Sequence, residues 1–444
     1  MRQLLKDLFL TNRFFAAFGG VIALFLLAFP IPALFPIALA GFCLAMALWT
    51  VDLFLLFRRP VRVLGNRRLP RVFSLGDDNR ITLELGNRSP LSLRLTVIDE
   101  LPFQFQIRDF RKVLHLQPGE RRSVVYHLRP LTRGAYAFGA TRIYASTRVG
   151  LIQRRFSLEH PTTVPVYPSI IQMKQYTLRA FNRVTAQKGI KRIRRIGHSY
   201  EFEQIKNYVR GDDYRSVNWK ATGRHATLMV NQYEDERAQQ IYCLIDKGRA
   251  MRMPFGGLSL MDYAINTTLA ISNIVLRKHD KAGLVTFSDK IGSTIRAERK
   301  ANQLNKILQA LYRESERPLE SNFELLYQVS RKLINGRSLL LLFTNFESAF
   351  ALDRVLPILR RINSLHLLVV VFFENTEVQD FIEKEPQTIE GIYTQTIARK
   401  FIAEKRQMVQ KLQQFGIQAI LTRPEDLTLQ TLNKYLELKS RGLI

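Results

Sequence analysis

Apolar residues dominate the first sixty positions of the chain and predict membrane-spanning helices. Residues 14–30 carry no charge, and residues 33–57 carry one ionisable group, Asp52. Apolar runs of about this length are what an α-helix needs to cross a bilayer. Pro30 and Pro32 between the runs indicate a sharp turn. The pattern therefore predicts a two-helix transmembrane hairpin over residues 14–57.

Basic residues on both sides of the hairpin predict its orientation. Arg2, Lys6 and Arg13 precede it, and the turn has no charge. The arginines that follow are Arg58, Arg59, Arg62, Arg67, Arg68 and Arg71. By the positive-inside rule both termini and the globular part are expected in the cytoplasm, with residues 1–13 as a cytoplasmic tail. The flanking arginines should attract anionic lipid, and Asp52 should reach water or pair with an arginine at the cytoplasmic helix end.

Residues 60–168 have the alternating pattern of β-strands. Apolar and polar positions alternate over residues 80–85, 91–97, 123–128 and 141–145, with glycine- and proline-bearing turns between them. Short strands at this spacing predict a β-sandwich-like domain. Such a domain is typically an interaction or spacer module.

Residues 239–444 alternate between apolar strands and amphipathic helices. Strands are predicted at residues 240–245, 282–287, 338–343, 366–373 and 416–421. Helices are predicted at residues 258–279, 301–312, 323–334, 397–415 and up to 438. The near-continuous apolar runs are typical of parallel strands covered on both faces. The fold class is therefore multidomain, with the hairpin, the β-sandwich-like domain and a doubly wound α/β domain.

Net charge and cysteine content limit the classes of protein to which this chain can belong. Lysine and arginine total 66 against 38 acidic residues, a formal net charge of +28, which favours anionic surfaces. Two cysteines exclude a disulfide-stapled secreted domain. A basic run at residues 188–195 could grip nucleic acid, but it has few aromatic residues for stacking, so a solvated or lipid-facing loop is favoured.

The irregular segment 169–238 holds a block of unusual residues. They are Gly197, Ser199, Glu201, Phe202, Arg210, Gly211, Asp212, Asp213, Arg215, Asn218, Trp219, Arg224 and Glu234. Arginines beside Asp212 and Asp213 should lower the pKa of both carboxyl groups, the opposite of what a general acid needs. Trp219 is expected to be a buried anchor whose loss unfolds the protein. We interpret the block as an ion-paired structural element, with partner binding as the alternative and no catalytic residue.

Together with residues 131–139 and 433–439, this motif block resembles the domain of unknown function 58 family. Those are bacterial proteins with two membrane helices, a β-sandwich-like segment and a von Willebrand factor A-like domain. The resemblance implies that fold for residues 239–444 and a place in the bacterial inner membrane. It also implies a MoxR-type AAA+ ATPase as partner.

Von Willebrand factor A-like domains often bind a divalent metal through Asp-x-Ser-x-Ser, a later Thr and a later Asp. The corresponding positions here are Asp246, Gly248, Ala250, Ser321 and Asn345. A hard cation prefers several oxygens and more than one carboxylate, and Lys247 and Arg249 add positive charge. No metal or other cofactor is therefore expected, and Asp246 should pair with a neighbouring base.

These observations favour a membrane-anchored, non-enzymatic scaffold that works with the ATPase in a chaperone-like or envelope-assembly role. One alternative is a metal-dependent adhesion module that takes its missing ligands from Asp262 or Glu347. Another is a membrane-tethered nucleic-acid binder using residues 188–195.

Overall fold

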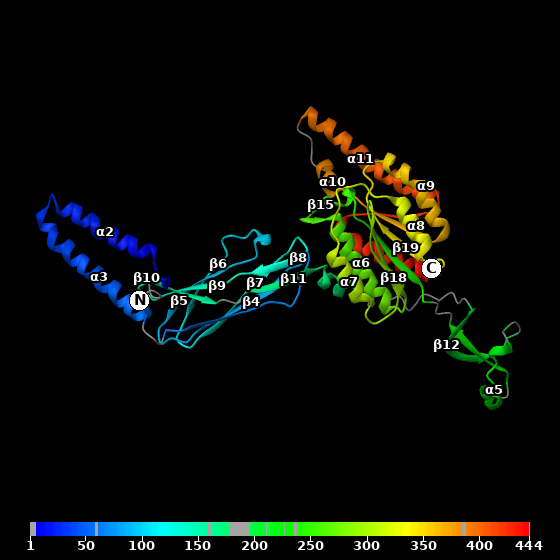
Figure 1. Ribbon diagram of the computed structural model, residues 1–444, viewed down its shortest axis with the longest axis horizontal. Coiled ribbons are helices and arrows are strands. Elements are labelled where there is room, and N and C mark those ends of the chain that lie inside the picture. The colour runs from blue at the N-terminus through cyan, green and yellow to red at the C-terminus, as the bar shows by residue number, and fades with distance from the viewer. Residues whose placement is uncertain are drawn as a thin grey trace. The chain divides into compact units, whose positions relative to one another are not determined.

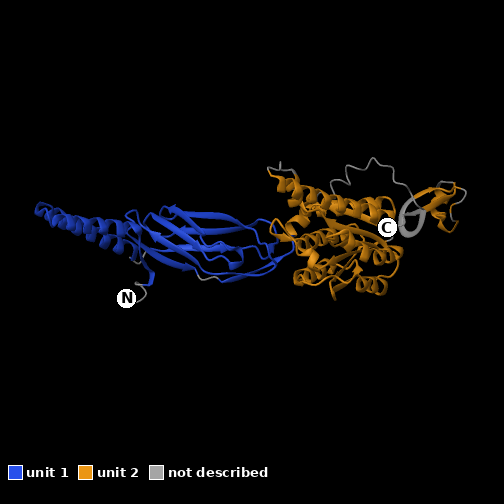
Figure 2. Ribbon diagram, turned by 90° about the horizontal axis from the view of Figure 1, so that it is seen from above, with its two compact units in different colours: residues 1–169 blue, residues 170–444 orange. Residues whose placement is uncertain are grey.

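The computed structural model divides the chain into two compact units, residues 1–169 and 170–444 (Figures 1 and 2). It describes residues 6–57, 61–158, 161–176, 196–209, 212, 214–225, 227–234, 238–383 and 388–443. The basic run at residues 188–195 lies outside this range, as do Arg58 and Arg59. The predicted order of apolar helices, a β-rich part and an α/β part is confirmed.

Two apolar helices follow one another near the start of the first unit. They are α2 (Asn12–Ala28) and α3 (Phe35–Phe57), joined through a 3₁₀ turn at Pro32–Leu34. The ring of Phe25 on α2 contacts those of Phe35 and Phe42 on α3, so the helices pack against each other. Among the described residues, the segment Pro32–Phe57 is long and apolar enough to cross a membrane, whereas α2 is shorter.

The described part of the first unit contains three β-sheets. The five-stranded sheet has the order β1 (Leu8–Leu10), β10 (Ile152–Leu158), β9 (Thr141–Ser146), β5 (Leu93–Asp99) and β6 (Arg111–Leu116). A second sheet has the order β2 (Val63–Arg68), β4 (Asn79–Asn87) and β7 (Arg121–Leu128). The third has the order β3 (Phe73–Ser74), β11 (Thr162–Tyr167) and β8 (Gly134–Phe138).

The first two of these sheets meet face to face. Gly65 on β2 lies so close to Ile143 and Leu158 of the five-stranded sheet that a side chain there would collide with Leu158. Alternate residues of β4 are buried toward this contact, as its sequence pattern predicts. The strand β1 was not predicted: it lies in the segment expected to be a tail, and it pairs antiparallel with β10.

Asp52 ties α3 to the β-rich part of the same unit. Its side chain is fully buried and accepts hydrogen bonds from the hydroxyl of Thr147 and from the backbone N–H groups of Leu151 (2.9 Å) and Ile152 (3.0 Å). The prediction that Asp52 reaches water or an arginine is therefore wrong. The turn between β9 and β10 supplies the donors instead.

Arg67 also departs from its predicted role. Its guanidinium forms a 2.6 Å ion pair with Asp99, and both side chains are almost fully buried. A buried, paired arginine is not free to bind lipid. Arg67 is therefore not one of the arginines that can attract anionic lipid, contrary to what the sequence had suggested.

In the described part of residues 238–443, six strands form one sheet. Its order is β18 (Ile291–Glu298), β17 (Lys281–Phe287), β14 (Gln240–Asp246), β19 (Leu339–Phe343), β20 (Leu367–Phe373) and β21 (Gln418–Thr422). All neighbouring pairs are parallel except β17 with β18. The near-continuous apolar strands are buried as predicted, whereas the antiparallel strand β18 was not foreseen.

Helices cover both faces of this sheet. One face packs against α6 (Leu260–Arg277), α7 (Gln303–Arg313) and α12 (Leu427–Ser440). The other packs against α8 (Phe323–Leu333), α9 (Ala349–Leu365) and α11 (Ile389–Gln414). The helix α10 (Thr376–Glu383) contacts α11. Along the chain, β17 and β18 are added on one side of β14, and β19, β20 and β21 are then added on its other side. The direction in which the sheet grows therefore reverses between β14 and β19. Open α/β sheets place their ligands at the carboxyl ends of the strands at this point.

Candidate functional site

A recess of about 270 Å³ lies at the carboxyl ends of β14 and β19. The five positions that correspond to the metal-binding pattern all line it: Asp246, Gly248, Ala250, Ser321 and Asn345. The structure thus brings together residues that are up to a hundred positions apart in the chain. The recess is the candidate functional site.

The carboxylate of Asp246 is already occupied by donors of the protein itself. Its Oδ1 accepts hydrogen bonds from the backbone N–H of Gly248 (2.8 Å) and the hydroxyl of Ser321, and its Oδ2 accepts one from Thr344 Oγ1 (2.7 Å). Burial raises the pKa of Asp246, while these hydrogen bonds act in the opposite direction. The expectation that Asp246 pairs with a base is wrong, because two hydroxyls and a backbone amide satisfy it.

Gly248 explains how Ser321 reaches this carboxylate. A side chain at position 248 would occupy the space that the Ser321 hydroxyl fills. The metal-binding pattern has a serine at this position, so the glycine removes one hydroxyl and leaves room for that of Ser321, from the segment before α8. The substitution leaves Asp246 hydrogen-bonded inside the protein.

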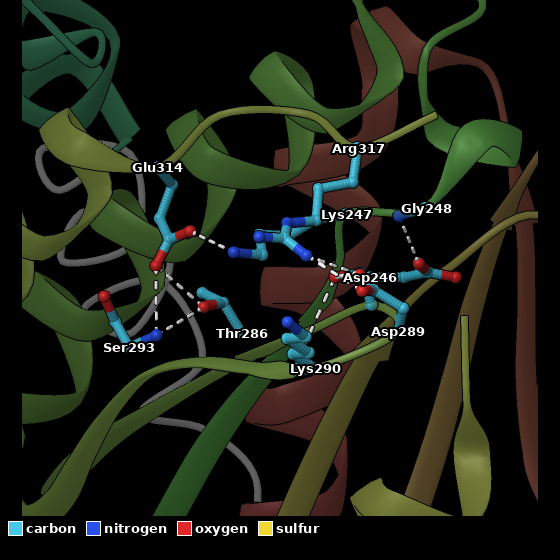
Figure 3. A network of polar contacts seen from close by, with 10 residues as sticks. Asp246, Lys247, Gly248, Thr286, Asp289, Lys290, Ser293, Glu314 and Arg317 are labelled. Carbon is cyan, nitrogen blue, oxygen red and sulfur yellow. Dashed lines mark hydrogen bonds and ion pairs between the residues drawn. The ribbon is translucent and has the colours of Figure 1, made fainter. Parts of the chain in front are cut away.

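Lys247 and Arg249, the basic residues that follow Asp246 in sequence, pair with other carboxylates. Lys247 Nζ lies 2.7 Å from Glu314 Oε2, and Glu314 also accepts hydrogen bonds from Thr286 Oγ1 and the Ser293 N–H (Figure 3). Arg249 is half-exposed and lies 3.5 Å from Glu320. Neither cation therefore neutralises Asp246 directly.

The arginine of a second ion pair borders this network. Arg317 donates from Nη1 to both carboxylate oxygens of Asp289, at 2.8 and 2.9 Å, and its backbone N–H donates to the carbonyl of Lys247 (Figure 3). The hydrogen bond from Arg317 holds the pKa of Asp289 below its usual value. The loop that carries Lys247 is thereby fixed to the segment after α7.

Lys405 is one of the residues of this region that the sequence did not indicate. It extends from α11 and donates to Asn345 Oδ1 (2.9 Å) and to the carbonyl of Phe346, at the end of β19. Burial lowers the pKa of Lys405 to about 8. A buried ammonium at this edge makes the binding of a further cation beside Asn345 less favourable.

Lys405→Met should remove a rise in stability between pH 8 and 10.5. In the unfolded chain the lysine holds its proton to about pH 10.5, but in the folded protein it loses it near pH 8. The unfolded state therefore binds more protons in this interval, and the free energy of unfolding increases with pH. Thermal unfolding of the full chain across this interval measures the slope. Lys411→Met, which removes an exposed lysine paired with Asp353, serves as control. Equal slopes for Lys405→Met and wild type would contradict the assignment.

The rim of the recess is open and mixed in character. Phe350 at the start of α9 is 80% exposed, and Arg354 pairs with Glu320 across the rim. Glu347 lies on the rim as well, but Asp262 caps the N-terminus of α6 in a capping box with Ser259. Within the part of the chain that the structure describes, no group of three or more His, Cys, Asp or Glu side chains could hold a metal.

The motif block forms a small module of its own. Its strands β12 (Ile196–Asn207) and β13 (Met229–Glu234) pair antiparallel, and the short helix α5 (Trp219–His225) lies between them in sequence. Gly197, Ser199, Glu201, Phe202 and Glu234 fall on these strands, but their side chains lie outside the described residues. Arg210, Gly211 and Asp213 lie outside them entirely.

Polar residues of the module that are described form local contacts. Lys206 Nζ lies 2.9 Å from Asp212 Oδ1, and this hydrogen bond lowers the pKa of Asp212. Asn218 accepts from the N–H of Ala221 at the start of α5 and donates to Asn231 on β13. The ion pairing expected for Asp212 is present, although its partner is Lys206.

Trp219 is not the buried anchor that the sequence suggested. Its side chain is 74% exposed at the first position of α5, and Tyr214 is 72% exposed. Arg224, later in α5, is exposed too, and the guanidinium of Arg215 lies 5.9 Å from the Tyr214 ring. A short helix with few residues to pack against leaves its first side chain in solvent. The module presents aromatic surface instead of enclosing it.

Comparison with known proteins places this region in context. Residues 204–380 match the family described as "Protein of unknown function DUF58". The "Uncharacterized protein YeaD" of Bacillus subtilis (strain 168) is 26% identical over 218 residues, which cover 48% of this chain and 52% of that protein. The chain thus spans about half the length of this relative.

Solved structures match a smaller part of the chain. The CARDB domain of the PF1109 protein from Pyrococcus furiosus is 11% identical, with 24% of this chain and 90% of that chain covered and a TM-score of 0.18. The ASH / PapD-like domain of human CEP192 is 14% identical, with 24% and 84% covered and a TM-score of 0.17. Scores this low do not bear on the fold. Residues 204–380, which hold most of the motif block and the recess at the carboxyl edge, match the DUF58 family, as the motifs predicted.

Proposed function

We propose that this chain is a membrane-anchored, non-enzymatic protein-binding scaffold whose α/β part is von Willebrand factor A-like. The observation that carries the proposal is the carboxylate of Asp246, which accepts three hydrogen bonds from the protein itself beneath an open recess. Three of the roughly four acceptor positions of this carboxylate are taken by donors of the protein itself, which leaves little room for a cation. The part of the recess that remains available to a binding partner is its rim.

The chemistry of the rim fits a protein partner. An exposed aromatic ring, Phe350, stands among the charged side chains of Arg249, Glu320 and Arg354. Aromatic residues and arginine are enriched where proteins bind one another. Trp219 and Tyr214 of the motif module provide a second exposed aromatic surface within the region that matches the family.

The partner we propose is a MoxR-type AAA+ ATPase, on the strength of the family resemblance. The scaffold would present the recess rim and the motif module to the ATPase in a chaperone-like or envelope-assembly role. Phe350 and Trp219 are large apolar side chains that a partner could remove from water. Each would contribute about 1.5–3 kcal/mol to binding if fully covered.

We propose further that α2 and α3 both span the bacterial inner membrane, with the rest of the chain in the cytoplasm. Both helices expose large apolar side chains along their length, among them Phe15, Leu26 and Phe54. Such side chains are stable in lipid and costly in water. The exposed arginines Arg62 and Arg71 would lie close to the anionic lipid surface.

Trp219→Ala is expected to leave folding intact and to reduce binding of the ATPase by about tenfold or more, as for an aromatic hot spot. Because the side chain is mostly exposed, the free energy of unfolding should change by less than about 0.5 kcal/mol. Affinity purification of the full chain from native membranes in mild detergent, with the ATPase quantified by mass spectrometry, measures the binding. Loss of folding in this variant would restore the buried-anchor interpretation.

The proposed function is tested in the same purification with two further variants. Phe350→Ala removes the aromatic ring of the rim, and Phe103→Ala removes an equally exposed ring (85%) from the β-rich part as matched control. Reduced recovery of the ATPase with Phe350→Ala but not with Phe103→Ala would support the proposal. Absence of any AAA+ ATPase from the wild-type sample would refute it.

A further inference from the structure

A cavity of about 680 Å³ in the first unit is lined by basic and polar side chains. Its charged members are Arg13, Arg94, Arg111 and Arg148, and His115 lies beside them. No aspartate or glutamate is among the lining residues. Within the described residues none of the four arginines forms an ion pair, so four cations face one cavity without a counter-charge.

The sheet and a turn hold these side chains in place. Arg94 on β5 is paired in register with Ser146 on β9 and with His115 on β6, so the three residues form one row on the same face of the sheet. Arg13 Nη1 donates to the carbonyl of Val149, in the turn that carries Arg148. The row and the turn form the floor and one wall of the cavity.

The first turn of α2 forms part of another wall. Thr11 caps this helix, and its hydroxyl donates to the carbonyl of Gly150 (2.7 Å). The first N–H groups of a helix have no partner inside the helix and favour an anion. The N-terminus of α2 therefore adds to the attraction that the four arginines exert.

The cavity lies next to both apolar helices, and this position indicates which kind of anion it would meet. Its turn, residues 147–150, touches both apolar helices: Thr147 bonds Asp52 of α3, and Gly150 bonds Thr11 at the start of α2. If the helices span the membrane, as proposed above, the cavity lies where they leave it. Lipid phosphates lie at this depth.

We propose that this cavity binds the phosphate-bearing head group of an anionic membrane lipid. Arginine suits this ligand because its planar guanidinium can donate two parallel hydrogen bonds to phosphate. Several arginines without carboxylate partners keep these donors free. The proposal rests on the membrane anchoring in the proposed function, and it names a specific lipid site in place of a general attraction of basic flanks.

The test compares two double variants of the full chain that lose equal charge. Arg94→Gln/Arg148→Gln removes two arginines of the cavity, and Arg80→Gln/Arg129→Gln removes two exposed arginines elsewhere in the β-rich part. Each protein is placed in vesicles of phosphatidylcholine with or without phosphatidylglycerol. The phosphatidylglycerol that remains bound after extraction into mild detergent is quantified by mass spectrometry.

Wild type and control should retain phosphatidylglycerol, and the cavity variant should bind it about tenfold more weakly or worse. Equal retention by both double variants would overturn the proposal, because general charge attraction would then suffice. Stabilisation of the detergent-solubilised protein by inorganic phosphate alone, to the extent seen with phosphatidylglycerol, would also overturn it by assigning the cavity to a free anion. Arg94→Lys/Arg148→Lys, which keeps the charge, should retain part of the binding and shows that the loss is not a folding defect.

Failure of this site is distinguishable from failure of the proposed function. Alkaline extraction of the same vesicles reports whether the chain is embedded in the bilayer. This readout does not depend on which lipid the cavity binds. Recovery of the ATPase should be equal for both double variants, because the recess and the motif module lie in the second unit.

Discussion

Asp52→Ala should destabilise the first unit by about 3–5 kcal/mol, one of the two largest effects expected for a single substitution in this chain. The carboxylate is fully buried and is the acceptor for Thr147 Oγ1 and the N–H groups of Leu151 and Ile152. Alanine leaves these donors buried without a partner, and each unsatisfied donor costs about 1–3 kcal/mol. Asp52→Asn should cost less, since its carbonyl oxygen can still accept from part of the set.

The chain provides its own fluorescent probe for this measurement. Its two tryptophans are Trp49, one turn before Asp52 on α3, and the exposed Trp219. In a Trp219→Phe background, Trp49 fluorescence during denaturation in mild detergent reports on the first unit. Asp7→Ala is the control, because Asp7 forms only a 3.4 Å, partly exposed ion pair with Arg155, which is expected to contribute less than about 1 kcal/mol. If Asp52→Ala unfolds at the same denaturant concentration as the control, the buried contact does not stabilise the unit.

The hairpin formed by β9 and β10 holds both apolar helices through hydrogen bonds. Besides Asp52, the carbonyl of Leu56 accepts a hydrogen bond from Arg154 Nη1 (3.0 Å), and Thr11 bonds the turn at Gly150. Both apolar helices are therefore fastened to one β-hairpin.

The elements predicted best are those whose pattern is decided locally. The run Leu339–Phe343 is apolar throughout because it is covered on both faces, and the sequence shows this without knowledge of its neighbours. The alternation of β4 likewise records one buried face. By contrast, β1 is three residues long and takes its structure from pairing with β10, about 140 positions away. Its own sequence resembles that of the apolar segment it precedes.

The contacts of individual polar residues depended on distant partners and could not be predicted. Arg67 was grouped with the lipid-facing arginines because it follows the helices, yet its partner Asp99 comes from β5. Lys405 comes to the candidate site from α11, 60 positions beyond Asn345. The residues around Asp246 lie together because strand ends share one edge of a sheet, whereas their hydrogen bonds depend on partners that the sequence does not identify.

The exposure of Trp219 could not be predicted from the sequence for a different reason. A large aromatic residue in a short motif is usually buried, and the sequence offers no sign of how much structure surrounds it. The structure gives the helix that carries it only seven residues. Exposure of Trp219 is thus a property of the module's small size, and it moves the expected consequence of substitution from folding to binding.

Glu314→Gln should destabilise the α/β part by about 3–5 kcal/mol, because it leaves the ammonium of Lys247 buried without a countercharge. The two side chains are only 10% and 6% exposed, and the 2.7 Å pair lies beside the candidate site (Figure 3). Burial raises the pKa of Glu314, but hydrogen bonds from Lys247, Ser293 and Thr286 outweigh it and leave the pKa below its usual value. The difference between wild type and variant should therefore be full above pH 4.5 and shrink as pH falls through the pKa of the folded state.

The double variant Lys247→Met/Glu314→Gln separates the ion pair from the rest of the network. It removes both charges while the glutamine oxygen can still accept from Thr286 Oγ1 and the Ser293 N–H. Its stability should lie within about 1.5 kcal/mol of wild type, well above that of Glu314→Gln alone, because the cost of the single variant is the stranded lysine. Hydrogen exchange of the amides of β14 and β17 in the full chain measures these free energies, with Asp353→Asn of the half-exposed Lys411 pair as control. A double variant as unstable as the sum of its single variants would mean that Lys247 and Glu314 contribute independently, and the buried ion pair would then not be what holds the loop after β14 in place.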